Sequence, residues 1–142
     1  AGSIIAGLTS DGSLANQGNL NIDATGAINA QGQLIAGGDL NSQAASHVLN
    51  QSLVQAKNIS LNSKSGQLSA QQSTIQAAQQ LNIVTPDTLD TQQANLKANK
   101  VQINAKDLNN QSGHIQQTGL DDTQILLTGD LSNQNGQIDS LG

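Results

Sequence analysis

The chain contains no aromatic residue, no methionine and no cysteine, and it also lacks arginine and glutamate. A globular domain of 142 residues normally fills its centre with aromatic side chains, because these bury the most area per residue. Here the core must be built from Leu, Ile, Val and Ala, which favours a narrow interior of stacked aliphatic side chains. The absence of cysteine excludes disulfides but does not select a cellular compartment.

Charge is also scarce, since charged residues make up 11% of the chain and the net charge is −5. The lysines are scattered and no aromatic ring is present to stack on a base, so the sequence predicts no nucleic-acid partner. No apolar run reaches the length of a membrane span, and no signal peptide is visible. The start at Ala1-Gly2, in a chain without methionine, predicts a fragment of a longer protein.

Glutamine recurs along the chain at nearly constant spacing, and an aliphatic residue stands three positions before each of these glutamines. The glutamines are Gln17, Gln31, Gln51, Gln71, Gln92, Gln111 and Gln134. The aliphatic residues are Leu14, Ile28, Val48, Leu68, Leu89, Leu108 and Leu131. From Gln31 onward the spacings are 20, 20, 21, 19 and 23 residues, and a fixed period near 20 is typical of a solenoid. We expect the glutamines to form one column whose side-chain amides bond to one another and fix the register of the coils.

Each repeat also contains alternating aliphatic residues, as in Ile59-x-Leu61, Leu81-x-Ile83 and Val101-x-Ile103, and this alternation predicts short strands. Repeats with about three such strands bury one continuous aliphatic core when they stack. The prediction is an all-β fold, a parallel β-helix with coils of about 20 residues. Residues 77–81 and 92–100 also have helix propensity, but the alternation that returns at 101–105 favours strands.

Two irregularities interrupt the repeat. Only 14 residues separate Gln17 from Gln31, which predicts a shortened repeat near 17–31. Residues 3–7 still follow the same pattern as residues 33–37, so the N-terminal part fits the repeat with a shift. An insertion is expected near 117–124, where Gly119 and two aspartates supply turn residues. The whole chain, 1–142, is predicted to be a single β-helix domain of about seven coils.

Residues 108–115 (LNNQSGHI) and 131–138 (LSNQNGQI) share one phrase, and residues 20–24 (LNIDA) and 34–40 (LIAGGDL) are related to it in pattern. These segments resemble the haemagglutinin repeats of filamentous-haemagglutinin-type exoproteins, which bacteria export by two-partner secretion. The resemblance implies a right-handed β-helix, an outer-membrane secretion partner, and a secreted protein at the bacterial cell surface. It further implies the fibrous shaft of an adhesin or of a contact-dependent growth inhibition effector.

Residues with catalytic or metal-binding chemistry are few and dispersed. The two histidines, His47 and His114, fall in different repeats, and we interpret both as solvated corner side chains. Asp121 and Asp122 are the one adjacent pair of acids. Metal sites and carboxylate catalysis both require several groups that converge on one point. The sequence therefore predicts no catalytic residue, no metal and no cofactor.

Three hypotheses for function remain. The first is a structural shaft that projects a distal domain, with the neighbouring repeats of the same chain as its main contacts. The second is an adhesive surface for a receptor or glycan on another cell, with Asp121, Asp122 and Thr123 of the insertion as candidate contacts, together with the scattered lysines. The third is a β-helix enzyme that acts on a polysaccharide, for which the sequence offers no recognisable binding groove.

Overall fold

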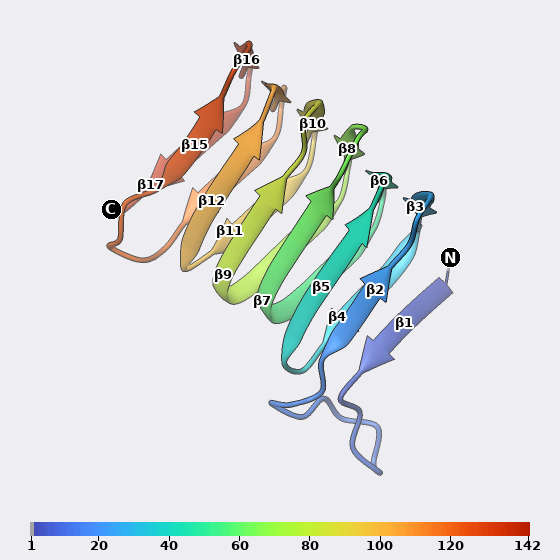
Figure 1. The fold of residues 1–142 in the computed structure, drawn as a ribbon. Coiled ribbons are helices and arrows are strands. Elements are labelled where there is room, and N and C mark those ends of the chain that lie inside the picture. Colours follow the sequence, from blue (N-terminus) through green and yellow to red (C-terminus); the bar gives the residue numbers. More distant parts are fainter. Residues whose placement is uncertain (1) are drawn as a thin grey trace.

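The computed structural model describes residues 2–142, and every regular element in that range is a β-strand (Figure 1). The strands are β1 (Gly2–Ala6), β2 (Leu20–Asp23), β3 (Ala27–Asn29), β4 (Gly32–Ala36), β5 (Asp39–Ala44), β6 (Ser46–Val48), β7 (Leu53–Ser63), β8 (Leu68–Ser69), β9 (Thr74–Val84), β10 (Thr88–Asp90), β11 (Asn95–Ala98), β12 (Lys100–Ala105), β13 (Asp107–Asn109), β14 (His114–Gln117), β15 (Gln124–Leu127), β16 (Leu131–Ser132) and β17 (Gln137–Ser140). The all-β prediction is confirmed. The segments with helix propensity contribute to β9, β11 and β12, so the helical alternative is wrong.

The strands wind into a parallel β-solenoid, as predicted. A full coil contains three strands, for example β11, β12 and β13, and in two coils the first two strands are fused into the 11-residue strands β7 and β9. Each strand pairs in parallel with its equivalent one coil later, and Leu53 lies beside Thr74, which in turn lies beside Asn95. The shortest strands form a six-stranded sheet in the order β16-β13-β10-β8-β6-β3. Figure 1 shows these strands along one edge of the stack.

Alternation along each strand determines which side chains reach the core. Leu40, Ile59, Leu81 and Val101 lie in register and are buried, whereas the residues between them and the next core position point outward. The core contains only Leu, Ile, Val and Ala among its apolar residues. Burying each large aliphatic side chain contributes roughly 1.5–3 kcal/mol. Stacking of coils supplies this burial, since a single coil covers neither end of its own column.

The first coil is longer than the others. Strand β1 pairs directly with β4, and Gly2 faces Gly32, so 30 residues separate equivalent positions. The extra residues form an excursion at 7–19, which we call the N-terminal excursion; it is closed by an antiparallel bridge between Leu8 and Leu14. Strand β2 then rejoins the stack beside β5. The predicted short repeat near 17–31 is therefore the end of a lengthened coil.

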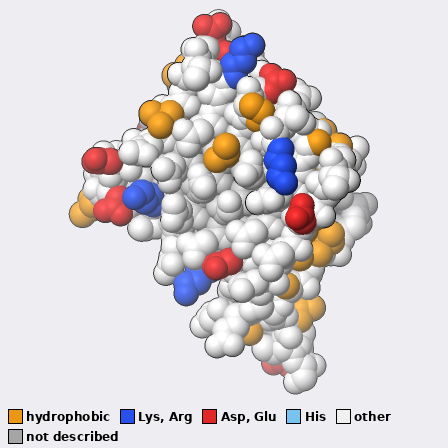
Figure 2. Space-filling model, in the orientation of Figure 1, with side chains coloured by type: hydrophobic (Ala, Val, Ile, Leu, Met, Phe, Trp, Pro, Cys, Tyr) orange, Lys and Arg blue, Asp and Glu red, His pale blue; other side chains and the backbone are white. Residues whose placement is uncertain are grey.

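The insertion at 117–124 lies between β14 and β15. Six residues connect these strands, against three between the paired residues Ala98 and Gln102 of the preceding coil. Residues 2–142 include no helix that is long and apolar enough to cross a membrane. Figure 2 shows one face, on which a few acidic and basic side chains lie close to one another within a mostly uncharged surface.

Candidate functional site

The glutamines of the repeat occupy two neighbouring columns instead of one. Side-chain amide bonds run from Gln31 to Gln51, from Gln51 to Gln72 over 3.0 Å, and from Gln72 to Gln93 over 2.8 Å. Gln71 lies one position before this ladder, and its Nε2 donates to Asp90 instead (2.6 Å).

The remaining predicted glutamines do not join the ladder. Gln92 donates to Asp90 over 3.2 Å, and Gln111 donates to the Ser132 hydroxyl over 3.2 Å. Gln17 lies in the N-terminal excursion, and its carbonyl oxygen is close to Gly7. For Gln134, the side chain takes part in none of the hydrogen bonds found in residues 2–142, while its carbonyl accepts from the Ser112 amide. The amide ladder thus spans four coils.

The ladder coincides with a strained backbone position. Gln51, Gln72 and Gln93 have φ of 59°, 57° and 56°, and their equivalents Ser112 and Asn135 have φ of 55° and 54°. A residue with a Cβ pays roughly 1–2 kcal/mol for this left-handed conformation. Interlocking amide bonds offset part of that cost, so the ladder holds a sharp corner at the same place in successive coils.

Substituting Gln72 separates these two contributions. Gln72→Ala removes both amide bonds and keeps the strain, so we expect a loss of about 1 kcal/mol in the free energy of unfolding. Gln72→Gly removes the same bonds but relieves the strain, and it should stay within about 0.5 kcal/mol of the original chain. Urea unfolding measures both. Gln76→Ala, at an exposed position on β9 just after this corner, is the matched control. An equal loss of stability in the Gln72→Ala and Gln72→Gly variants would contradict the assignment.

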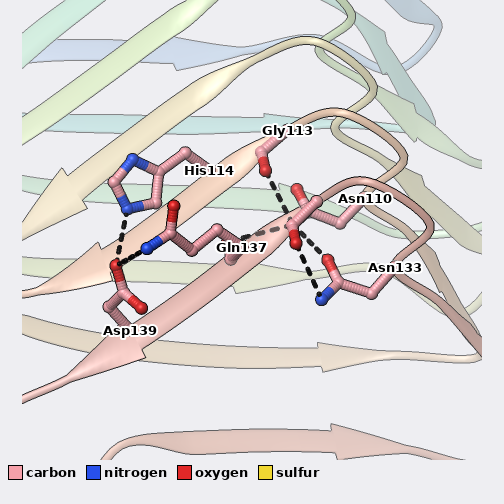
Figure 3. Close-up of polar contacts among 7 residues, drawn as sticks. Asn110, Gly113, His114, Asn133, Gln137 and Asp139 are labelled. Carbon is pink, nitrogen blue, oxygen red and sulfur yellow. Dashed lines mark hydrogen bonds and ion pairs between the residues drawn. The ribbon is translucent and has the colours of Figure 1, made fainter.

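A second amide contact lies inside the corner, next to the core (Figure 3). Asn110 is fully buried, and its Oδ1 accepts from the Thr91 hydroxyl over 2.7 Å. Its Nδ2 donates to Asn133 Oδ1 over 2.8 Å and approaches the carbonyl oxygens of Gly113 (3.4 Å) and Gln137 (3.3 Å). Asn110 therefore links three successive coils from within.

Glycine accompanies asparagine at this corner. A Cβ added to Gly113 would lie 2.4 Å from Asn110 Oδ1, and one added to Gly136 would lie 2.4 Å from Asn133 Oδ1. In the preceding coil, Thr91 stands at the position of the asparagine and Ala94 at the position of the glycine. The phrase in residues 108–115 thus combines a buried asparagine with a glycine that packs against its side-chain amide.

The insertion at 117–124 is anchored by a buried amide. Gln117 is 1% exposed, and its Oε1 accepts from the backbone amide of Val101 over 2.9 Å. Its Nε2 donates to the carbonyl oxygen of Asp121. The predicted contact residues Asp121 and Asp122 are exposed on this loop, and the Thr123 hydroxyl lies 2.5 Å from Ser140 Oγ.

His114 lies on β14 and not at a solvated corner, although it is partly exposed as expected. Its Nε2 is 3.0 Å from Asp139 Oδ2, which also accepts from Gln137 Nε2 over 2.8 Å (Figure 3). The contact bridges two coils on the outer face. Within the described part of the chain, no three His, Cys, Asp or Glu side chains are placed to bind a metal ion.

His47 was interpreted from the sequence as a solvated corner residue, and this is wrong. Strand pairing places His47 between Ile28 and Leu68, so the histidine itself, and not Val48, occupies the inward column. Its side chain is fully buried. Burial lowers the pKa of the imidazole below its usual value.

The N-terminal excursion carries a further polar cluster and one wall of a groove. Thr9 and Ser13 hydrogen-bond to the Asp11 carboxylate and lower its pKa to about 2. Leu14 of the excursion faces Ala36 and Ala56 across a groove of about 450 Å³. Lys57, one of the scattered lysines, borders this groove, and the other residues that line it are uncharged.

Comparison with known proteins gives one informative match. The chain is 34% identical over 133 residues to Toxin CdiA of Yersinia pestis, and the match covers 94% of this chain and 4% of that protein. The chain thus corresponds in length to a small segment of its relative. No protein-family model and no solved structure matches the chain. Together with the β-solenoid, this match confirms the resemblance to repeats of secreted bacterial cell-surface exoproteins.

Proposed function

We propose that this chain, a β-solenoid segment homologous to part of Toxin CdiA, forms a length of the shaft of a secreted surface exoprotein and projects a distal domain away from the cell. One observation carries the proposal: equivalent strands pair in parallel without interruption from β3 to β16. Such a stack forms a continuous rod that holds whatever follows it at a fixed distance along its axis. Each coil adds about 4.8 Å, so six coils extend the shaft by roughly 29 Å.

The terminal coils present surfaces suited to further stacking. Ile4 lies in the column of Leu34 and Val54 but is 49% exposed, and Leu131 lies in the column of Leu108 but is 53% exposed. Additional coils on either side would cover these side chains and pair the open strand edges. Burial of this kind supports a role as one section of a longer solenoid.

The composition also suits export through an outer-membrane partner before folding. The chain has no cysteine that could form a disulfide before passage, and its core lacks bulky aromatic side chains. Solenoid coils contact only their neighbours, so folding can proceed coil by coil as the chain emerges. A secretion partner in the outer membrane follows from this proposal, as does a distal domain that either adheres to a target cell or inhibits its growth.

In-register duplication tests the shaft proposal. Residues 33 and 137 are equivalent positions of different coils, so tandem copies of residues 33–136 join with their registers matched. Each copy contains five coils and should add roughly 24 Å, so four copies lengthen the surface fibre of the parent exoprotein by about 95 Å. Electron cryotomography of whole cells measures this length, while a target-cell assay measures the activity of the distal domain.

The matched control duplicates residues 33–126, which ends half a coil out of register. We expect this variant to be degraded or retained, because its columns do not continue across the junction. A fibre whose length does not change with the in-register copies would contradict the shaft proposal.

A second candidate function is an adhesive surface at the insertion. Leu120 is 82% exposed, and Asp121 and Asp122 are exposed beside it. Surface loops carry a large share of binding residues, and Leu120 gives this loop an apolar side chain that a partner would cover. Deleting residues 121–123 restores the loop length of the preceding coil and should abolish binding to cells or glycans if this loop is the contact. Unchanged binding would leave the shaft role alone.

A further inference from the structure

A polar cluster interrupts the aliphatic core between the second and third turns of the stack. His47 on β6 occupies the column that elsewhere contains Ile28, Leu68 and Leu89. It is 0% exposed. A leucine fills this position in every later coil, so the column does not require a histidine for packing.

Two serines complete the cluster. His47 Nε2 lies 2.8 Å from Ser42 Oγ on β5, and Nδ1 lies 2.8 Å from Ser63 Oγ at the end of β7. Ser63 Oγ also approaches the carbonyl oxygen of Gln67 over 3.4 Å. A neutral imidazole satisfies this arrangement with one donor and one acceptor nitrogen. Ser42 and Ser63 themselves replace apolar residues, since Ser42 pairs between Ile22 and Leu61 and Ser63 pairs with Ala44.

Among residues 2–142, no charged group faces the imidazole. The ionisable residues on the adjoining elements are Asp23 on β2, Asp39 on β5, Lys57 on β7 and Lys64 just after β7. Asp39 is half-buried and bonded to Asn58, and the other three are exposed on the outer surface. The strands β3, β6 and β8 carry no ionisable residue apart from His47. A proton added to this ring would therefore be buried without a counter-ion.

We propose that the cluster of His47, Ser42 and Ser63 is a pH-sensitive site in the solenoid. When the medium becomes acidic, the coil that contains β5 and β6 separates locally from the coil that contains β7 and β8. This inference does not depend on the shaft role. Stability in a solenoid is the sum of coil and interface contributions, so the penalty of protonation falls on these coils and not on β10 to β17.

The direction of the pH effect follows from linkage. Burial lowers the pKa of His47 in the folded chain, so the opened form takes up the proton first. The stability of these coils is complete above a pH of about 6.5, the usual pKa of histidine, and falls as the pH drops toward the lower pKa of the folded state. Each pH unit within that window reduces the population ratio of closed to open coils by about tenfold.

Hydrogen exchange at pH 7.5 and pH 5.0 on the whole chain tests this proposal, with rates corrected for the intrinsic effect of pH. We expect amide protection in residues 39–63 to fall at pH 5.0, by up to about thirtyfold, the limit set by the distance of this pH from the usual histidine pKa. Protection in residues 88–109 should stay the same. His114→Gln is the matched control, because it removes the other histidine from the outer face and should leave the loss unchanged.

Two variants remove the titrating ring. His47→Gln keeps a neutral side chain that can hydrogen-bond, and the triple variant S42I/H47L/S63A reproduces the residue types of neighbouring coils. Either variant that folds should show equal protection at the two pH values. The proposal would be overturned if amide protection in the original chain did not change with pH. It would also be overturned if a folded variant without His47 lost as much protection at pH 5.0 as the original chain.

Discussion

Leu81→Ala is expected to lower the free energy of unfolding by about 4 kcal/mol, toward the upper part of the range of 2–5 kcal/mol for such changes. Leu81 is 0% exposed and lies between Ile59 and Val101 of the adjacent coils. The backbone on both sides is held by strand pairing, so neighbouring side chains cannot close the cavity. A central position also weakens two coil interfaces at once.

The measurement is urea unfolding monitored by far-ultraviolet circular dichroism, which reports strand content in a chain without tryptophan. Asn82→Ala on the same strand is the control, because Asn82 points outward; we expect it to change stability by less than about 0.5 kcal/mol. Equal losses for Leu81→Ala and Asn82→Ala would mean that the alternation of inward and outward residues is assigned incorrectly.

Gly113→Ala is expected to lower the free energy of unfolding by about 2 kcal/mol. The added Cβ would lie 2.4 Å from Asn110 Oδ1 and 2.4 Å from the Thr91 carbonyl oxygen. Overpacking of this kind typically costs 1–3 kcal/mol. Gly26→Ala is the control, because nothing lies within 4 Å of a Cβ at that position.

A double-mutant cycle sharpens this prediction. Asn110→Thr combined with Gly113→Ala recreates the pair formed by Thr91 and Ala94 in the preceding coil. We expect the double variant to be at least about 1 kcal/mol more stable than the sum of the single effects. Additive effects would show that the glycine is required by the backbone alone, and not by the asparagine amide.

The sequence predicted the parallel solenoid because aliphatic alternation survives in most coils. Residues 3–7 parallel residues 33–37, and the structure pairs Ser3 with Gln33 through to Ala6 with Ala36. The aliphatic composition predicted the narrow core equally well. In both cases the signal is local, because the alternation of apolar and polar residues within a single strand shows which face is buried.

Register at the corners was harder to predict. Two adjacent glutamines, Gln71 and Gln72, are equally good matches to Gln51, and strand pairing resolves them in favour of Gln72. His47 and Val48 pose the same problem, because an apolar residue beside a polar one is normally assigned to the core. A shift of one residue exchanges the inward and outward positions, and only the neighbouring coils determine it.

The corner phrase in residues 108–115 was interpreted as a register device built on Gln111. In the structure, the buried hydrogen bond between coils is made by Asn110, one residue earlier, which donates to Asn133. Gln111 donates to Ser132 at a more exposed position. The pairing of asparagine with glycine was visible in the sequence at 110 and 113 and again at 133 and 136. Its physical reason appears only when the distance from Gly113 to the amide is known.

Disulfide formation between engineered cysteines tests the stacking of coils most directly, because the natural chain has no cysteine. Gln55 pairs with Gln76 on an exposed face, and residues one coil apart have the Cα separation that a disulfide needs. The variant with cysteines at 55 and 76 should form an intramolecular disulfide under mild oxidation at low protein concentration. Cysteines at 55 and 74, offset by two residues on the same face, should not form one. Efficient bonding at 55 and 74, with none at 55 and 76, would contradict the parallel register on which this account of the chain depends.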